Sequence, residues 1–114
     1  MKTFKLVLLF VALGLIACRS KVIQVTLMND SAQPVSTIIV DYPGGIFGDN
    51  SLAPGKTYVY KIKLVESGPL KLEFTDAQGA RHQNVVLPLL HKGQEGSIEI
   101  HLTQQASTAV AAVR

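Results

Sequence analysis

Alternation of apolar and polar residues, interrupted by clusters of turn-forming residues, is the feature that most constrains how this chain can fold. In the segment 21–30, Ile23, Val25 and Leu27 alternate with polar neighbours, which is the period of two of a strand with one buried face. The same alternation recurs in three later segments, 56–64, 70–76 and 97–102. Turns separate such segments at intervals of about eight to twelve residues, so the sequence predicts an all-β fold, a small antiparallel β-sandwich of about six to eight strands.

Two further segments read as strands, and two do not. Residues 35–42 are apolar at nearly every position, which predicts a central strand covered on both faces, and residues 80–87 also have the composition of a strand. Residues 43–55 contain two prolines and four glycines, and we expect a long connection there. The polar and then alanine-rich residues 104–114 are predicted to be a flexible tail, because a short unpacked helix is marginal in water.

The first residues have the organisation of an export signal. Lys2 and Lys5 precede an apolar run of eleven residues, 6–16, and small Ala17 stands directly before Cys18. A run of that length is too short to cross a hydrocarbon core about 30 Å thick as a helix. A basic start, an apolar middle and a small residue before the break are the parts of a secretory signal peptide.

The residues "LIAC", 15–18, resemble the lipobox of bacterial lipoproteins. The resemblance implies cleavage between Ala17 and Cys18, acylation of the Cys18 thiol, and therefore a membrane partner reached through an N-terminal lipid. We accordingly expect a signal peptide at 1–17, a lipidated N-terminus and short tether at 18–21, and a β-sandwich domain at 22–103. An ordinary secretory signal followed by a free cysteine is the alternative.

A second resemblance concerns the fold alone. The segment "LAPGKTYVYKIKL", 52–64, in which a Pro-Gly turn precedes a strand with alternating aromatics, is similar to strands of bacterial immunoglobulin-like and transthyretin-like envelope domains. It supports a sandwich and implies no activity, because one fold hosts many functions.

Charge gives no reason to expect a nucleic-acid partner. The chain holds 11 basic and 8 acidic residues, but Lys2 and Lys5 would leave with the signal. The remaining 97 residues, 18–114, are then nearly neutral, whereas a nucleic-acid-binding domain needs a concentrated basic stripe.

Metal sites and cofactors find little support in the sequence. A blue-copper centre needs two histidines, a thiolate and usually a thioether, but Cys18 would carry the lipid and Met28 is the one methionine left after signal removal. His82, His91 and His101 have no ligand at the close spacing typical of zinc sites. We predict no metal site and no cofactor. The alternative function is a small-ligand or metal-binding periplasmic lipoprotein that uses its histidines.

Catalytic patterns are also missing from the sequence. There is no Gly-x-Ser-x-Gly motif. Nothing in the spacing of Asp41, Asp49, Asp76 and Glu95 favours the paired carboxylates of a glycosidase. We therefore expect a protein that is not an enzyme.

Two surfaces are candidates for binding. In the segment 42–55, Tyr42, Ile46, Phe47, Asp49 and Asn50 could contact a partner, with Phe47 as an aromatic anchor. The alternative, which we favour, is that Ile46 and Phe47 form a short strand and Phe47 fills the core, because a small domain needs its large apolar residues inside.

The second candidate is a set of lysines. If the segments 56–64 and 70–76 pair as a hairpin, their basic residues share one outer face, which could contact anionic lipid or an acidic glycan: Lys56, Lys61, Lys63 and Lys71. Interspersed surface charge is the more ordinary reading of these residues.

These observations favour a lipid-anchored binding or structural module of the cell envelope, a non-catalytic accessory protein that docks an envelope protein near the membrane. In the lipoprotein resemblance, Arg19 after Cys18, in place of the aspartate that marks inner-membrane retention, implies the periplasmic face of the outer membrane.

Overall fold

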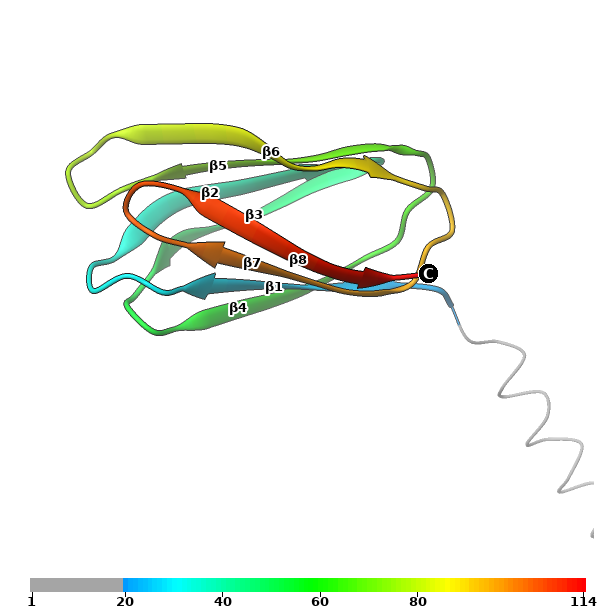
Figure 1. Cartoon of the computed structure of the whole chain (residues 1–114), viewed down its shortest axis with the longest axis horizontal. Helices are drawn as coiled ribbons and strands as arrows, with labels where there is room; N and C mark the ends of the chain where they lie inside the picture. Colours follow the sequence, from blue (N-terminus) through cyan, green and yellow to red (C-terminus); the bar gives the residue numbers. More distant parts are fainter. Residues whose placement is uncertain (1–19) are drawn as a thin grey trace, which may run out of the picture.

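Eight β-strands pack as two four-stranded sheets in the computed structural model, which describes residues 20–114 (Figure 1). In chain order they are β1 (Ile23–Asn29), β2 (Val35–Tyr42), β3 (Gly45–Leu52), β4 (Thr57–Ile62), β5 (Gly68–Thr75), β6 (Arg81–Leu90), β7 (Gly96–Leu102) and β8 (Ser107–Val113). The predicted all-β sandwich is therefore confirmed for these residues. The predictions for 1–17, and for the lipidated Cys18, fall outside the described residues.

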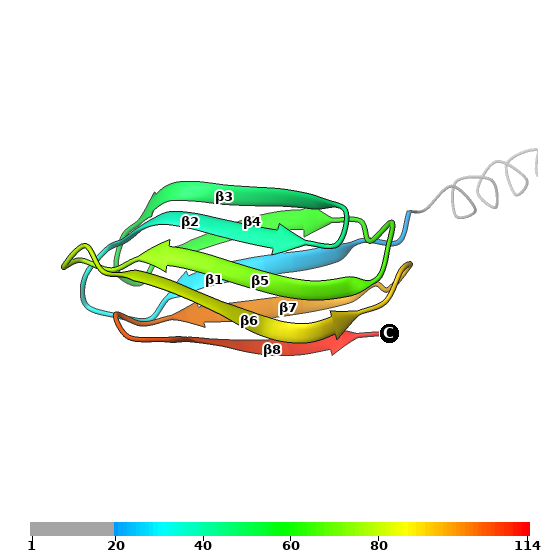
Figure 2. The ribbon, with the colours of Figure 1, turned by 90° about the horizontal axis from the view of Figure 1, so that it is seen from above.

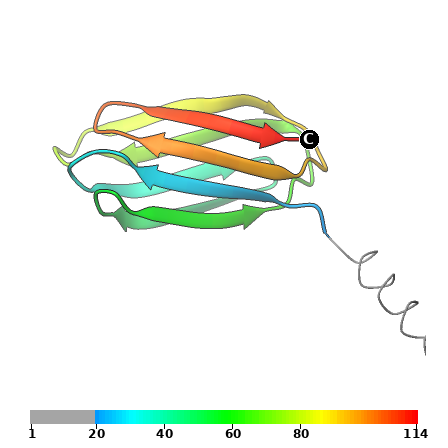
Figure 3. The ribbon, with the colours of Figure 1, turned by 60° about the horizontal axis from the view of Figure 1, so that its bottom comes forward.

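The two sheets differ in how their strands are connected. One has the order β3-β2-β5-β6, with all neighbours antiparallel (Figure 2). The other has the order β4-β1-β7-β8, seen from its outer side in Figure 3, and its central pair β1 and β7 is parallel. We expected antiparallel strands throughout. The chain instead passes to the other sheet and back twice between β1 and β7, and β7 arrives beside β1 in the same direction.

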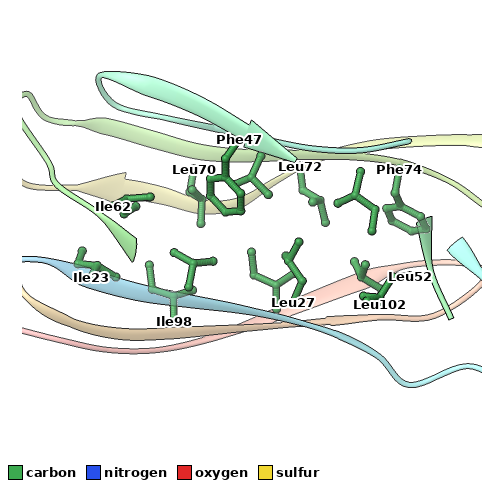
Figure 4. Packing of buried hydrophobic residues seen from close by; sticks show 14 of the residues in the cluster. Ile23, Leu27, Phe47, Leu52, Ile62, Leu70, Leu72, Phe74, Ile98 and Leu102 are labelled. Carbon is green, nitrogen blue, oxygen red and sulfur yellow. The ribbon is translucent and has the colours of Figure 1, made fainter. Parts of the chain in front are cut away.

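The core lies between the sheets, and the alternating segments supply it (Figure 4). Ile23, Val25 and Leu27 of β1 are fully buried, as are the alternate residues of β5 and β7: Leu70, Leu72, Phe74, Ile98, Ile100 and Leu102. Burying a side chain of this size contributes about 1.5–3 kcal/mol each to the stability of the fold. The predicted inward face of these strands is confirmed.

A buried asparagine joins the two sheets at the end of β1. Asn29 is 1% exposed, and its Nδ2 donates to the carbonyls of Gln33 and Leu52, both at 2.9 Å. Its Oδ1 accepts from the Ser31 backbone N–H and hydroxyl. Because a buried amide costs free energy unless it is hydrogen-bonded, this arrangement fixes the β1–β2 turn against β3.

The predicted flexible tail at 104–114 is wrong for most of its length. Residues Ser107–Val113 form β8, which pairs antiparallel with β7 from Ser107 opposite Leu102 to Val113 opposite Gly96. The open edge of β7 supplies backbone partners that a local reading of alanine-rich sequence cannot anticipate. The domain therefore continues beyond residue 103.

The predicted connection at 43–55 is also largely a strand. Gly45–Leu52 form β3 and pair with β2, and the chain turns at Pro43 and Gly44, where Gly44 has φ +101°. Gly48 permits the close approach of β3 to β2, since a Cβ there would lie 2.1 Å from the carbonyl oxygen of Ile38. The prediction of a strand covered on both faces fails for β2, because Ile39 is only half-buried on the outer face.

No helix in residues 20–114 has the length and apolarity to span a membrane.

Candidate functional site

Phe47, the proposed aromatic anchor, is a core residue. It is 7% exposed and lies in an aromatic cluster with Tyr42, Tyr58 and Tyr60, which we call the aromatic seal. Its ring stacks on that of Tyr60 with 4.5 Å between centroids and an interplanar angle of 12°. Phe47 therefore cannot meet a partner, and the favoured alternative, a strand that buries Phe47, is confirmed.

Ile46 points the other way and belongs to an exposed face. It is 63% exposed and lies opposite Asp41 on the neighbouring strand β2. With Ile39 and Val85 it lines a shallow hollow of about 470 Å³ on the outer face of the β3-β2-β5-β6 sheet. Asp49 is half-buried and Asn50 exposed, both farther along β3. The five residues proposed for the segment thus do not form one site.

The rim of this hollow is polar and of mixed charge. Asp41 lies opposite Lys71 across β2 and β5, while Glu73 of β5 pairs with Arg81 and accepts a hydrogen bond from Gln83 Nε2 at 3.2 Å. The Arg81 hydrogen bond lowers the pKa of Glu73 below 4.5. Such a surface offers apolar contact at its centre and charges of both signs around it. The sequence signal for this hollow is a pair of adjacent valines in β6, Val85 and Val86, of which Val85 faces outward.

The three histidines occupy separate places. His82 Nε2 lies 2.8 Å from Asp76 Oδ2, and its ring stacks on Phe74. His91 begins the turn between β6 and β7 at the opposite end of the sandwich, where its backbone N–H donates to Gln94 Oε1 at 2.8 Å. They therefore do not gather into one ligand site.

His101 contacts two carboxylates, one on each ring nitrogen. Nδ1 lies 2.7 Å from Asp30 Oδ2 and Nε2 lies 3.4 Å from Glu99 Oε2. Because these carboxylates lie on opposite sides of the ring, they do not converge on a common point. Within residues 20–114, no three His, Cys, Asp or Glu side chains are arranged to hold a metal ion.

The contacts of His82 and of His101 with carboxylates each shift one pKa. The hydrogen bond from His82 lowers the pKa of Asp76 below its ordinary value of 3.8, helped by the backbone N–H groups of Ala80 and Gln78. The hydrogen bond to Asp30 raises the pKa of His101 above 6.5. In each case the hydrogen bond favours the charged form of the shifted group, Asp76 or His101. These contacts hold the turns 76–80 and 30–34 in place.

The candidate lysine face does not form, in line with the ordinary surface charge that we favoured. β4 pairs with β1 in one sheet, whereas β5 pairs with β2 and β6 in the other, so Lys61 and Lys71 lie in different sheets. Lys56 stands in the turn before β4, at the end of the sandwich opposite Lys63. The assumed hairpin does not exist, because alternation specifies which face of a strand is buried and leaves its partner open.

Basic residues gather instead at the end of the sandwich where the described chain begins. Two surface hollows adjoin Ser20 there. Together they are lined by five basic residues, which we call the basic end: Lys21, Lys61, Lys63, Lys92 and Arg114. Glu66 and Glu95 are the acidic residues of this end, and Glu95 lies 3.5 Å from Arg114. Four separate segments supply the basic end, so no local sequence signal marks it.

The carboxylates considered for catalysis are also dispersed. Asp41 and Asp49 lie on the neighbouring strands β2 and β3. Asp76 lies in the β5–β6 turn beside His82, and Glu95 lies at the other end of the sandwich beside Arg114. Asp76 and Glu95 are thus engaged in separate contacts.

Comparison of the chain with protein-family models, with curated proteins and with solved structures found no match.

Proposed function

We propose that this protein is a lipid-anchored, non-catalytic module of the bacterial cell envelope that docks an envelope protein close to the membrane. The observation that carries the proposal is the lipobox-like "LIAC" directly before a single β-sandwich. Cys18 would receive the acyl chains, and Arg19 after it favours the periplasmic face of the outer membrane. Each buried CH₂ group of an acyl chain contributes about 0.8 kcal/mol, so two or more chains give a durable anchor.

The position and charge of the N-terminal end support this orientation. Only residues 19–21 separate Cys18 from residue 22, a reach of about 10 Å for extended chain. The basic end surrounds Ser20, so it would face the lipid headgroups. A Lys or Arg close to an anionic membrane surface contributes about 1 kcal/mol to binding. The lipid and the charges would act on the same end of the domain.

The anchor is tested by mass spectrometry of the mature N-terminus after extraction in detergent. We expect a chain that starts at Cys18 and carries the mass of its acyl groups. The control is Cys18→Ser, which should release the protein from the membrane fraction. An unmodified Cys18 thiol, or cleavage at another residue, would contradict the proposal.

The contribution of the basic end is tested separately. The double variant Lys63→Glu and Lys92→Glu is compared with Lys56→Glu and Lys71→Glu, a pair of lysines outside the basic end. We expect only the first to weaken binding of the lipidated protein to phosphatidylglycerol vesicles relative to phosphatidylcholine vesicles. Equal losses in both doubles would show that the orientation is wrong.

For the partner, we favour contact through the outer face around Ile46. A photo-crosslinking residue in place of Ile46 should join one envelope protein in living cells, whereas the same residue in place of exposed Gln78, in the turn at the far end, should not. Recovery of no protein neighbour from position 46 would remove the accessory-protein proposal.

A further inference from the structure

Four strands form the edges of the two sheets in residues 20–114: β3 and β6 in one sheet, and β4 and β8 in the other. An edge strand presents unpaired N–H and C=O groups that can pair with another chain, and natural sheets usually protect such edges with charges, proline or bulges. The four edges of this protein differ in whether they carry such protection.

Three of the edges are protected. β4 carries Lys61 and ends beside Lys63. β3 carries Asp49. β6 contains Pro88, which lacks an N–H, and its pairing with β5 shifts register twice. These features discourage another strand from adding to any of the three.

Within its own bounds β8 has none of these features, and the nearest charge is Arg114, directly after its last residue. Its sequence, STAVAAV, contains no charge and no proline, and its pairing with β7 is continuous from end to end. Val110 at its centre is 62% exposed. Over the part of the chain that the structure describes, β8 pairs only with β7. The backbone groups along its outer edge are therefore free to pair with a further strand.

The hydrogen bonds at the end of β8 show which of its groups are free. Arg114 donates to the Glu95 carbonyl at 2.9 Å and accepts from the Glu95 N–H at 3.1 Å, so its backbone groups point toward the β7 side. In an antiparallel pair this direction alternates along the strand. The groups of Thr108, Val110 and Ala112 therefore also point to β7. Those of Ser107, Ala109, Ala111 and Val113 point outward.

We propose that β8 pairs antiparallel with β8 of a second copy of this chain, about a two-fold axis that passes at Val110. This register places Ala109 opposite Ala111 of the second copy and Ser107 opposite Val113, so every outward N–H and C=O of the strand gains a partner. Val110 then lies opposite Val110 of the second copy. The small residues and missing charges of the strand make it compatible with its own antiparallel copy.

This register pairs more of the outward backbone groups than the neighbouring registers do. An axis at Ala109 or at Ala111 would leave the outward groups at one end of each strand unpaired, and an axis between adjacent residues would set outward groups against groups already bonded to β7. The pairing would join two four-stranded sheets into one continuous sheet. A contact through one strand is smaller than the interfaces of about 1,200–2,000 Å² that hold stable complexes. We therefore infer a weak dimer, which the proposed membrane anchor would favour by confining the copies to one surface.

Cysteine substitution in the full chain, produced in cells that export it, tests the register. At a non-hydrogen-bonded antiparallel pair the Cα atoms lie about 4.5 Å apart, within the range of about 4.4–6.8 Å that a disulfide spans. Val110→Cys should therefore give a disulfide-linked dimer on mild oxidation. Thr108→Cys is the matched control on the same face of β8: the two copies of that position would be four residues apart, about 13 Å, and should not link.

A mixture adds a second requirement. Thr108 lies opposite Ala112 of the second copy in this register, so Thr108→Cys and Ala112→Cys chains should link when produced together, although neither links alone. Dimer from Val110→Cys should exceed that from Thr108→Cys at least tenfold. Equal yields, no yield, or a Val110→Cys disulfide with a different protein would each overturn the second copy as occupant.

A charge variant gives an independent readout by amine crosslinking in the membrane. Val110→Glu would place two carboxylates opposite each other and should abolish the crosslinked dimer. Val59→Glu, at an exposed position of β4 on the opposite edge of the same sheet, should leave the dimer unchanged. Loss in both variants, or in neither, would contradict the proposal. The unsubstituted chain, in which Cys18 is the single cysteine, tests the anchor separately. A disulfide dimer of that chain would show that the Cys18 thiol is free, and the comparison of Val110→Cys with Thr108→Cys would still test the register.

Discussion

The two sides of the sandwich are closed in different ways. On the side of β3 and β4, the aromatic seal places Phe47 among three tyrosines between the sheets. On the side of β6 and β8, the residues are smaller, and Asn84 and Ser107 exchange hydrogen bonds of 2.9 and 3.0 Å across the gap. The first side is held by buried apolar area and the second by exposed polar contacts. We therefore expect the first side to open at a much higher free energy, and the edge strand of the second to be more accessible for pairing.

Partial burial on the second side supports this difference. Both sides have partly buried residues against the core, but those of the second side, Val86, Leu87, Ala109 and Val113, are smaller than Tyr42 and Tyr58 of the first. Ala111 of β8 is exposed, and Val110 projects from the strand. Regions with few buried contacts open at lower free energy than the core. The side that is weaker in isolation is thus the one that presents β8 to a second copy.

The largest effect should come from the aromatic seal. Phe47→Ala removes a buried ring that is 7% exposed, and we expect it to lower the free energy of unfolding by about 3–5 kcal/mol. Val110→Ala, on the other side, should change it by less than about 0.5 kcal/mol. Urea unfolding in detergent-free vesicles measures both. Similar midpoints for the two variants would refute the contrast between the sides.

Two glycine substitutions should each lower the free energy of unfolding by less than Phe47→Ala does, and each should act on one side of the sandwich. A Cβ at Gly96 would lie 2.1 Å from the carbonyl oxygen of Ala112, and Gly96 has φ +135°, so Gly96→Ala should cost about 1–3 kcal/mol and displace β8. Gly48→Ala should displace β3 in the same way, since its Cβ would meet the Ile38 carbonyl. Amide hydrogen exchange shows which strands lose protection in each variant.

Those two variants also separate the sides functionally. Gly96→Ala should weaken the Val110→Cys crosslink, and Gly48→Ala should leave it intact. If both variants reduced the crosslink equally, the dimer would depend on the stability of the whole fold and not specifically on β8.

A smaller effect is expected from the polar contact between β6 and β8. Asn84→Ala or Ser107→Ala should each cost about 1 kcal/mol, the usual net contribution of exchanged hydrogen bonds. The double variant should cost little more than either single variant, because both remove the same contact. Full additivity in urea unfolding would show that Asn84 and Ser107 do not support each other.

The smallest effect should be the pH dependence that Asp76 contributes beside β6. The pKa of Asp76 is lowered in the folded state, chiefly by His82, so its stabilisation is present above pH 3.8 and is lost as pH falls through the lowered value. NMR titration should give an Asp76 pKa below 3.8 that rises in His82→Gln. Phe47→Ala should leave this titration unchanged. An ordinary Asp76 pKa in the parent protein would argue against the contact.

Much of the core was predictable because alternation is a local signal. Ile23, Val25 and Leu27, like Ile98, Ile100 and Leu102, were expected to face inward and are fully buried. The sequence predicted only a short strand at Ile46 and Phe47 in place of the eight-residue β3, and it did not predict β8. Both strands have compositions that propensity disfavours: β3 contains Gly45 and Gly48, and β8 is rich in alanine. Pairing with a neighbour overrides such weak preferences.

The candidate surfaces were less predictable than the core. Phe47 could be placed inside on the general need of a small domain for apolar residues, and Ile46 then follows outward by alternation. The basic end, by contrast, combines Lys21, Lys61, Lys63, Lys92 and Arg114 from four separate segments. Its existence depends on which strands begin and end together.

The sequence by itself determined the class of fold and the inward face of its alternating strands, because the side chains of a strand alternate with a period of two wherever that strand is placed. Only the tertiary structure decided the partners: β4 beside β1, β1 parallel to β7, and β8 on the outer edge of β7. Strand pairing joins residues far apart in the chain through backbone groups that every residue shares, so side-chain pattern alone does not specify it.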